Sequence, residues 1–192
     1  MEWILASASP RRQELCQRLG IPVTVIPAQS ETAPDPALPP ETAVRRVAQD
    51  KAREVFAAHP DAAVLGADTV VAVPEGDAER LLGKPRDAEQ AAAMLRRLQG
   101  TTHRVLTGVC LCGPFGEESF TAAASVTFYP MTEAEIAAYV ATGEPMDKAG
   151  AYGIQGFGMR YIEGIDGDYY TVMGLPAARC WQLFEKFKDF SK

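Results

Sequence analysis

The sequence contains few residues of the kinds that bind transition metals or cross-link a chain. It has only two histidines, and its four cysteines (Cys16, Cys110, Cys112 and Cys180) show none of the spacings typical of a disulfide framework. Cys110 and Cys112 lie in an alternating apolar run, so both thiols are expected on the same face of a strand. A metal site there lacks further ligands because histidines are so scarce. We therefore expect buried, reduced thiols and a cytoplasmic protein.

Membrane-spanning apolar segments and an excess of positive charge are also absent from the sequence. Apolar stretches such as 62–73 are far too short for a membrane helix. The first residues, Met-Glu-Trp-Ile-Leu-Ala, lack the basic and apolar segments of a signal peptide. The net charge of −6 argues against nucleic acid or an anionic membrane as the main partner. A small anion in a local basic pocket remains compatible with it, because the positive residues are clustered along the chain.

The pattern of apolar residues predicts the class of fold. A chain of 192 residues can form one core or two lobes around a cleft, and 47% hydrophobic with 23% charged residues is close to the globular average. Strands and helices alternate before a hairpin at 113–116, which predicts an α/β fold with a mixed, twisted sheet flanked by helices. We expect a single domain over 1–192 that has two lobes around a cleft. The expected strands are about 3–6, 23–26, one or two within 62–73, 104–112, 119–129 and 160–165, and the expected helices are about 10–20, 41–59, 87–100, 132–143 and from 176 onward. Three helix starts carry capping signals, which are Ser9, Asp87 and the capping box of Thr132 with Glu135.

Asp68 is the only ionisable residue in the apolar run 62–73. A carboxylate in such surroundings needs a cation, hydrogen-bond donors or a strand-end position facing a cleft. It could cap a turn. A metal ligand or a general base is favoured, because sites in α/β proteins lie at the carboxyl ends of strands.

Two other segments carry positive charge where it is unexpected. Lys51 lies seven residues after Val44 and so on the apolar stripe of its helix, where it either extends to an edge or reaches an anion site. Ser7-Ala-Ser-Pro-Arg11-Arg12 places hydroxyls, backbone amides and two guanidiniums at a helix N-terminus. That arrangement predicts an anion cradle, with a simple cap and surface arginines as the alternative.

Three further polar residues carry less information by themselves. Lys84 lies on a turn between a strand and a helix, and Gln155 lies among glycines where backbone can approach a ligand closely. His103 follows a helix end, and a structural role is the better interpretation.

Taken together, these segments resemble the Maf family, once described as septum-formation inhibitors and similar in fold to the inosine-triphosphate pyrophosphatases. The matching stretches run nearly end to end and in order. They are Leu5-Ala-Ser-Ala-Ser-Pro-Arg-Arg12, Lys51-Ala52, Gly66-Ala-Asp-Thr-Val-Val71, Gly83-Lys-Pro85, Leu98-Gln-Gly-Thr-Thr-His103, Gly143-Glu-Pro-Met-Asp-Lys-Ala-Gly-Ala-Tyr-Gly-Ile-Gln-Gly156 and Gly174-Leu-Pro176.

The resemblance implies hydrolysis of a nucleoside triphosphate to the monophosphate and pyrophosphate with a divalent metal, Mg²⁺ or Mn²⁺, in a homodimer. The Ala-Tyr-Gly-Ile-Gln-Gly form resembles the branch that acts on dTTP and UTP, with modified pyrimidine nucleotides as further substrates. The family resemblance also implies that Asp68 is the proton acceptor and that Glu31 and Asp68 are metal ligands. Ser7, Arg11, Arg12, Lys51, Thr69, Lys84 and Gln155 are the implied substrate-binding residues, among which Arg11, Thr69 and Gln155 set specificity. Many family members have an Asp-Glu pair where this chain has Ser30-Glu31.

Two alternative functions follow from the same residues. One is a pyrophosphatase for 7-methyl-GTP or another modified nucleotide, the preference of a second branch that differs in the glutamine segment. The other is a non-catalytic nucleotide-binding regulator of division, which leaves the isolated Asp68 unexplained.

Overall fold

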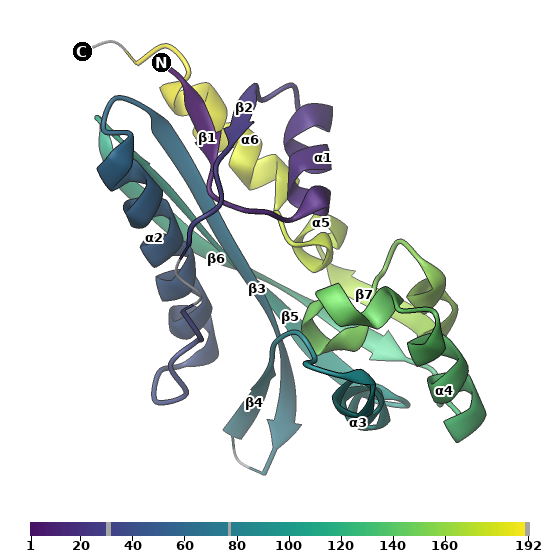
Figure 1. Ribbon diagram of the computed structural model, residues 1–192. Helices are drawn as coiled ribbons and strands as arrows, with labels where there is room; N and C mark the ends of the chain where they lie inside the picture. The colour runs from purple at the N-terminus through teal and green to yellow at the C-terminus, as the bar shows by residue number, and fades with distance from the viewer. Residues whose placement is uncertain (30–31, 77, 191–192) are drawn as a thin grey trace. The chain divides into compact units, whose positions relative to one another are not determined.

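The computed structural model describes residues 1–29, 32–76 and 78–190. It confirms the predicted mixed α/β architecture (Figure 1). The strands are β1 (Trp3–Leu5), β2 (Val23–Val25), β3 (Ala63–Glu75), β4 (Ala78–Leu82), β5 (Thr102–Gly113), β6 (Gly116–Phe128) and β7 (Ile162–Gly167). The helices are α1 (Pro10–Arg18), α2 (Pro40–Ala58), α3 (Ala88–Leu98), α4 (Glu133–Ala141), α5 (Tyr169–Met173) and α6 (Ala177–Phe187), with short 3₁₀ turns η1 (Glu144–Asp147), η2 (Ala149–Ala151) and η3 (Phe157–Tyr161).

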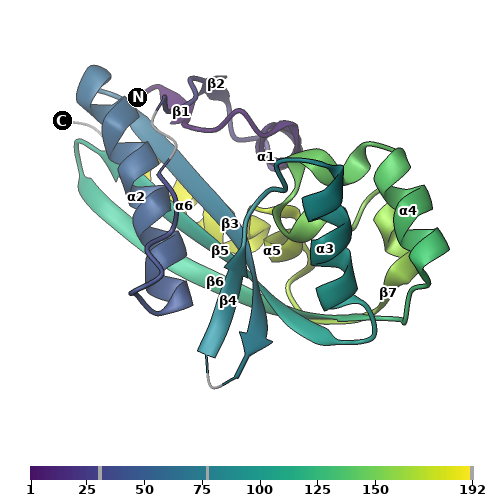
Figure 2. The same ribbon diagram turned by 60° about the horizontal axis from the view of Figure 1, so that its bottom comes forward.

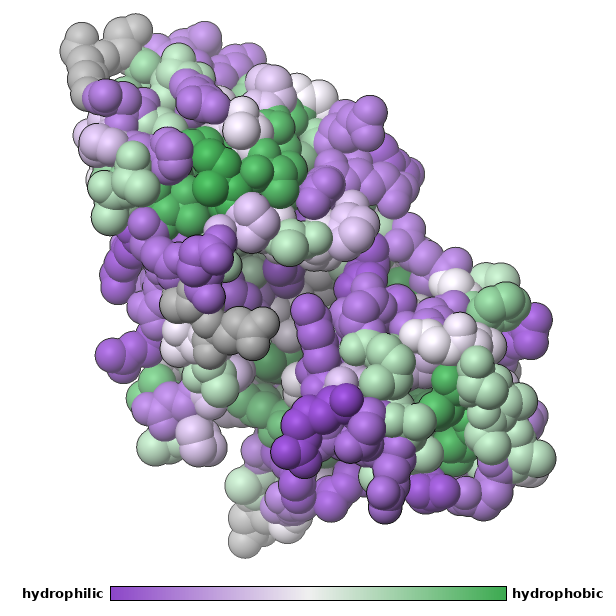
Figure 3. Space-filling view, in the orientation of Figure 1, coloured by the Kyte–Doolittle hydropathy of each residue, from purple (hydrophilic) through white to green (hydrophobic). Residues whose placement is uncertain are grey.

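The sheet is mixed because it contains both parallel and antiparallel strand pairs. Its strand order is β2-β1-β3-β5-β6-β7, and β4 pairs with β3 outside this path. β1 is parallel to both β2 and β3, whereas β4 is antiparallel to β3 and β7 is antiparallel to β6. β2 is a short edge strand, and Figure 3 shows hydrophobic residues gathered over β1 and β2. Because β2 has only three residues, it offers another chain few backbone groups for strand pairing.

The sequence signals for helix ends are confirmed at several positions. Asp87 caps α3 by accepting from the Gln90 N–H at 2.7 Å. Thr132 and Glu135 form the predicted capping box of α4. Ser9 is the N-cap residue of α1, but its side chain makes no capping hydrogen bond, so the expected hydroxyl cap is absent there.

The chain forms two compact units, each with its own apolar core. The first comprises 1–68, 107–122 and 174–192, and the second comprises 69–106 and 123–173. In the first unit α2 packs on β1, β3 and β5 through small side chains that include Ala48 and Ala52. In the second unit α3 and α4 lie side by side, as Figure 2 shows, over a core that includes Leu95, Phe128 and Tyr152.

None of the helices in the described part of the chain is long and apolar enough to cross a bilayer. All four cysteines are buried and carry thiols rather than disulfides, as predicted.

Candidate functional site

The N-terminus of α1 has the local chemistry of an anion site. Pro10 occupies the first turn of the helix, which contains no acidic residue, and Arg11 and Arg12 follow it. The Ser9 N–H donates to Ser7 Oγ at 3.3 Å, which folds the preceding loop back toward the helix. Amides at a helix start carry partial positive charge, and the two guanidiniums add to it. The turn therefore favours an anionic ligand.

Arg12 is a buried guanidinium that also holds this turn together. Its side chain donates through Nε to the Gly174 carbonyl at 2.8 Å and through Nη1 to Ser7 Oγ at 3.0 Å. Burial lowers the pKa of Arg12, and the negative charge of Asp68 opposes that shift. Arg12 thus binds the hydroxyl of Ser7 and interacts electrostatically with Asp68. Arg11 is half-buried on the same turn.

Lys51 and Asp68 form a direct ion pair. Lys51 Nζ lies 2.6 Å from Asp68 Oδ1, and the two side chains are 22% and 18% exposed. This contact takes Lys51 from the apolar stripe of α2 to a partly buried carboxylate. It also excludes a turn cap for Asp68, which lies inside β3.

Of the three surroundings expected for Asp68, the cation is present as Lys51, whereas the strand end is not found, because β3 continues seven residues beyond Asp68, to Glu75. Its neighbour in the sheet explains why the position is still accessible. Parallel pairing of β1 with β3 stops at Leu5 and Leu65, and the Ala6 N–H donates to the Leu65 carbonyl at 2.9 Å. Asp68 follows three residues later, where β1 has already turned toward α1.

Gly66 determines how closely α2 approaches this part of β3. A Cβ at residue 66 would lie 2.5 Å from the Ala48 carbonyl oxygen and 2.9 Å from Ala52 Cβ. Only glycine allows this separation. The close packing brings Lys51 within hydrogen-bonding distance of Asp68.

The other predicted substrate residues belong to the second unit. Thr69 is half-buried in β3, and Lys84 and Gln155 are exposed. The turn that carries Lys84 is tied to the glycine-rich segment, because the Gly150 N–H donates to the Gly83 carbonyl at 3.0 Å. Within the second unit the structure therefore links the Lys84 turn with the segment that leads to Gln155.

Glu144 anchors the loop around Gln155 and was missed as a functional residue in the sequence. Its carboxylate accepts from the Phe157 N–H at 2.7 Å, from Tyr139 Oη at 2.8 Å and from the Gly158 N–H at 3.1 Å. Burial raises the pKa of Glu144, but these three hydrogen bonds outweigh it and the net direction is down. The carboxylate is thus held ionised at the base of the loop.

The position of the Glu144 carboxylate also leaves no room for a side chain at Gly156. A Cβ at Gly156 would lie 2.1 Å from Glu144 Oε2. The Gly153 N–H donates to Tyr139 Oη at 3.0 Å, so Tyr139 and Glu144 hold the backbone on both sides of Gln155. A glutamate followed by proline, near a run of glycines, is the sequence signal that could have drawn attention to it.

His103 has the structural role predicted for it. It is 1% exposed, and its Nε2 lies 2.8 Å from Tyr152 Oη. Burial lowers the pKa of His103 to about 4, so the ring is neutral at physiological pH.

Of the two predicted metal ligands, Asp68 is among the described residues. Glu31 lies outside the described residues. Asp68 offers the hard carboxylate oxygen that Mg²⁺ and Mn²⁺ prefer, which fits the expected ion. Over 1–29, 32–76 and 78–190, one group of three metal-binding side chains converges, and it is a different one, made of Cys110, Cys112 and Glu117.

The fold and these residues define an α/β protein with two arginines at the start of α1 and an ion-paired carboxylate that interacts electrostatically with one of them. The sequence model of the family described as Maf-like protein matches residues 2–187. The chain belongs to this family, which confirms the resemblance found in its motifs.

Three relatives of this chain are named for the same activity. A dTTP/UTP pyrophosphatase of Moorella thermoacetica is 51% identical over 186 residues, covering 96% of this chain and 94% of its own. Namesakes from Koribacter versatilis and Bacillus velezensis are 48% and 47% identical, with 97% and 96% of this chain and 94% and 95% of their own covered. Among solved structures, the Staphylococcus aureus Ham1 protein matches with a TM-score of 0.49 and 13% identity over 98% of this chain and 100% of its own. That likeness is too distant to carry an argument.

Proposed function

We propose that this protein is a nucleoside triphosphate pyrophosphatase that converts dTTP and UTP to the monophosphate and pyrophosphate. The observation that carries the proposal is the 47–51% identity, over nearly the whole length of the chain, to proteins named dTTP/UTP pyrophosphatase. The reaction forms a bond between a water oxygen and the α-phosphorus, and breaks the bond from that phosphorus to the bridging oxygen of pyrophosphate.

In this proposal Asp68 accepts the proton of the attacking water. Lys51 holds Oδ1 of that carboxylate at 2.6 Å, which fixes the orientation of the group. We assign the water to Oδ2. A base fixed in this way contributes by orientation as well as by proton transfer.

The positive groups of the first unit are assigned to the phosphates. Arg11 offers forked N–H donors to phosphate oxygens, and Arg12, whose Nε and Nη1 already donate to Gly174 and Ser7, contributes its positive charge. Ser7 and the first amides of α1 contribute neutral donors. Negative charge grows on pyrophosphate as it leaves, so donors held in place before the reaction lower the barrier. Lys84 supplies a further point charge. Lys51 can also donate to a phosphate oxygen when the substrate binds.

Recognition of the base is assigned to Thr69 and Gln155. The amide of Gln155 offers one donor and one acceptor, which suits the N3–H and O4 edge of uracil or thymine. The support of the loop by Glu144 favours this role, because a recognition group must keep its orientation before the substrate arrives.

A divalent cation completes the proposed site. Asp68 and Glu31 would hold Mg²⁺ or Mn²⁺ together with substrate phosphate oxygens, since such ions use few protein carboxylates in nucleotide sites. When bound, the ion supplies charge neutralisation on the phosphates and lowers the pKa of a coordinated water.

Pyrophosphate release measured over dTTP, UTP, CTP and 7-methyl-GTP, with Mg²⁺ and with Mn²⁺, tests the assignment. Asp68→Asn should lower kcat by about 10²–10⁴-fold with nucleotide binding retained, whereas Asp61→Asn, the same change at an exposed position just before β3, should not. Wild-type protein that binds UTP but forms no monophosphate with either metal is a regulator and not an enzyme. Faster hydrolysis of 7-methyl-GTP than of UTP would refute the pyrimidine preference alone.

We also propose a homodimer located in the cytoplasm. Four buried thiols favour a reducing compartment. The dimer rests on family resemblance, and light scattering of the purified chain should give twice the 20.7 kDa of one copy.

A further inference from the structure

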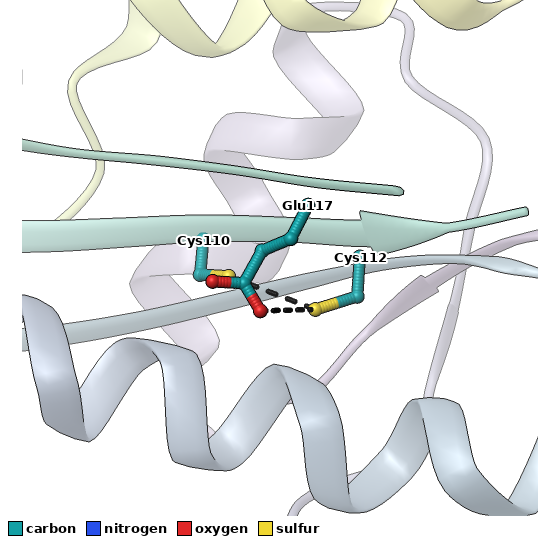
Figure 4. Close-up of side chains that lie close together, drawn as sticks. All are labelled: Cys110, Cys112 and Glu117. Atoms are coloured by element: carbon teal, nitrogen blue, oxygen red, sulfur yellow. Dashed lines mark hydrogen bonds between the residues drawn. The ribbon is translucent and has the colours of Figure 1, made fainter. Parts of the chain in front are cut away.

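Two thiols and a carboxylate converge in the first unit, and none of the three is among the residues assigned to the substrate. Cys110 and Cys112 are on β5, and Glu117 is on β6 just after the two-residue turn that joins the strands. Figure 4 shows the three side chains directed toward one another. Their ligand atoms all lie within 4.8 Å of one another.

Two of the three separations between ligand atoms match those of a tetrahedral site for a zinc-like divalent ion, and the third is at most 4.8 Å. Zinc bonds of about 2.3 Å to sulfur and about 2.0 Å to oxygen, at tetrahedral angles, place two sulfurs about 3.8 Å apart and a sulfur about 3.5 Å from an oxygen. Cys110 Sγ and Cys112 Sγ are 3.7 Å apart, and Cys112 Sγ lies 3.6 Å from Glu117 Oε2. Both separations fit without rearrangement of the strand.

The surroundings of the three ligands provide both shielding and access. Cys110 and Cys112 are 0% and 3% exposed in the apolar layer between the sheet and α2. The Glu117 side chain is 28% exposed, so an ion can enter from its side. Two thiols at the closed end and a carboxylate at the open end form a three-ligand set with one position left for water.

The present partners of Glu117 keep its carboxylate ionised. Arg53 donates to it through Nε at 2.6 Å and Nη2 at 2.9 Å, and Gln49 donates through Nε2 at 2.8 Å. The hydrogen bond from Arg53 is the main reason that the pKa of Glu117 is lowered, against a smaller rise from burial. Arg53 therefore occupies the place of a cation and competes with any metal for the carboxylate.

We propose that Cys110, Cys112 and Glu117 form a binding site for Zn²⁺ or a cation of the same class. Binding forms two metal–thiolate bonds and one metal–carboxylate bond, and a water takes the fourth position. The two thiol protons pass to solvent, and Glu117 leaves Arg53. The site differs in kind from the proposed Mg²⁺ or Mn²⁺ position at Asp68, which offers only oxygen.

Cobalt(II) titration of the reduced, full-length protein tests this proposal directly. Tetrahedral thiolate coordination should give sulfur-to-cobalt charge-transfer absorption and strong visible bands, with one equivalent bound and displaced by Zn²⁺. Cys112→Ser should remove most of the charge-transfer absorption. Cys180→Ser, which changes another buried thiol of the same unit, should leave the spectrum intact.

Two surface variants separate metal binding from damage to the fold. Glu117→Gln should weaken cobalt binding at least about tenfold, as expected for the loss of one ligand. Arg53→Ala removes the competing cation and should strengthen binding. Weaker binding in Arg53→Ala, an unchanged spectrum in Cys112→Ser, or rapid closure of a Cys110–Cys112 disulfide in place of metal uptake would overturn the proposal.

Discussion

The ammonium group of Lys51 lies 2.6 Å from Oδ1 of Asp68, so the one ionisable side chain in the apolar part of β3 has a cation from α2 as its direct partner. The pair joins a helix to a strand at a position where each residue alone would be unfavourable. Both charges are only about one-fifth exposed, so water compensates poorly for the loss of either one.

Replacing Lys51 with Met should destabilise the protein by about 1–3 kcal/mol, between the values for exposed and for buried pairs. Urea denaturation of Lys51→Met, Asp68→Asn and the double variant measures the coupling. The double variant should lose less stability than the sum of the single losses. Arg18→Met breaks an exposed pair with Glu14 and should cost under about 0.5 kcal/mol. Additive losses at Lys51 and Asp68 would mean that the pair contributes nothing.

Gly66→Ala should lower both stability and activity. The new Cβ meets the Ala48 carbonyl and Ala52, so α2 must move away from β3, at a cost of about 1–3 kcal/mol. The same movement lengthens the Lys51–Asp68 contact and should reduce kcat. Gly164→Ala is the matched control, because a Cβ there has no heavy atom within 4 Å. Equal behaviour of the two variants in thermal unfolding and in pyrophosphate release would contradict this view of Gly66.

Glu144→Gln should impair substrate recognition more than chemistry. The carboxylate accepts three hydrogen bonds, from the Phe157 N–H, the Gly158 N–H and Tyr139 Oη, and uses both of its oxygens. An amide has only one oxygen and cannot accept all three, so the loop around Gln155 loosens. We expect KM for UTP to rise about tenfold, which corresponds to about 1.4 kcal/mol, with a smaller change in kcat. Glu163→Gln, at an exposed position of β7, serves as the control. A fall in kcat at constant KM would place Glu144 in the chemistry instead.

His103 should make stability depend on pH in a defined window. Its folded pKa of about 4 lies below the ordinary 6.5, so between these values the unfolded chain binds a proton that the folded protein excludes. Stability from this residue is therefore complete above pH 6.5 and is lost as the pH falls toward 4, by up to about 3 kcal/mol. Urea denaturation at several pH values should show a shallower dependence for His103→Gln. An identical slope in the variant would mean that other groups carry the effect.

Local signals in the sequence predicted most elements, because the residues that decide them are close together. The caps at Asp87 and Thr132 each involve a partner three residues away. β4 was not predicted, since Ala78–Leu82 is short and carries two charges, and its pairing with β3 determines its conformation. α5 was missed for a similar reason, at five residues.

In the candidate site, too, the sequence identified single residues but not the contacts between distant ones. The helical period marked Lys51 as unusual and the apolar run marked Asp68, but nothing in the sequence indicated that they pair across 17 positions. The scarcity of histidine argued against a metal at Cys110 and Cys112. That argument overlooked Glu117, which only the hairpin turn brings beside them.

The hydrogen bond from Arg12 to the Gly174 carbonyl has a consequence for synthesis of the chain. The first unit needs residues 174–192, whereas the second is complete at residue 173. A ribosome releases the chain from its N-terminus, so the second unit can fold while the first still lacks its last segment. Ser7 and Arg12 therefore precede the second unit in the chain, but they reach their final arrangement only after Gly174 has been made.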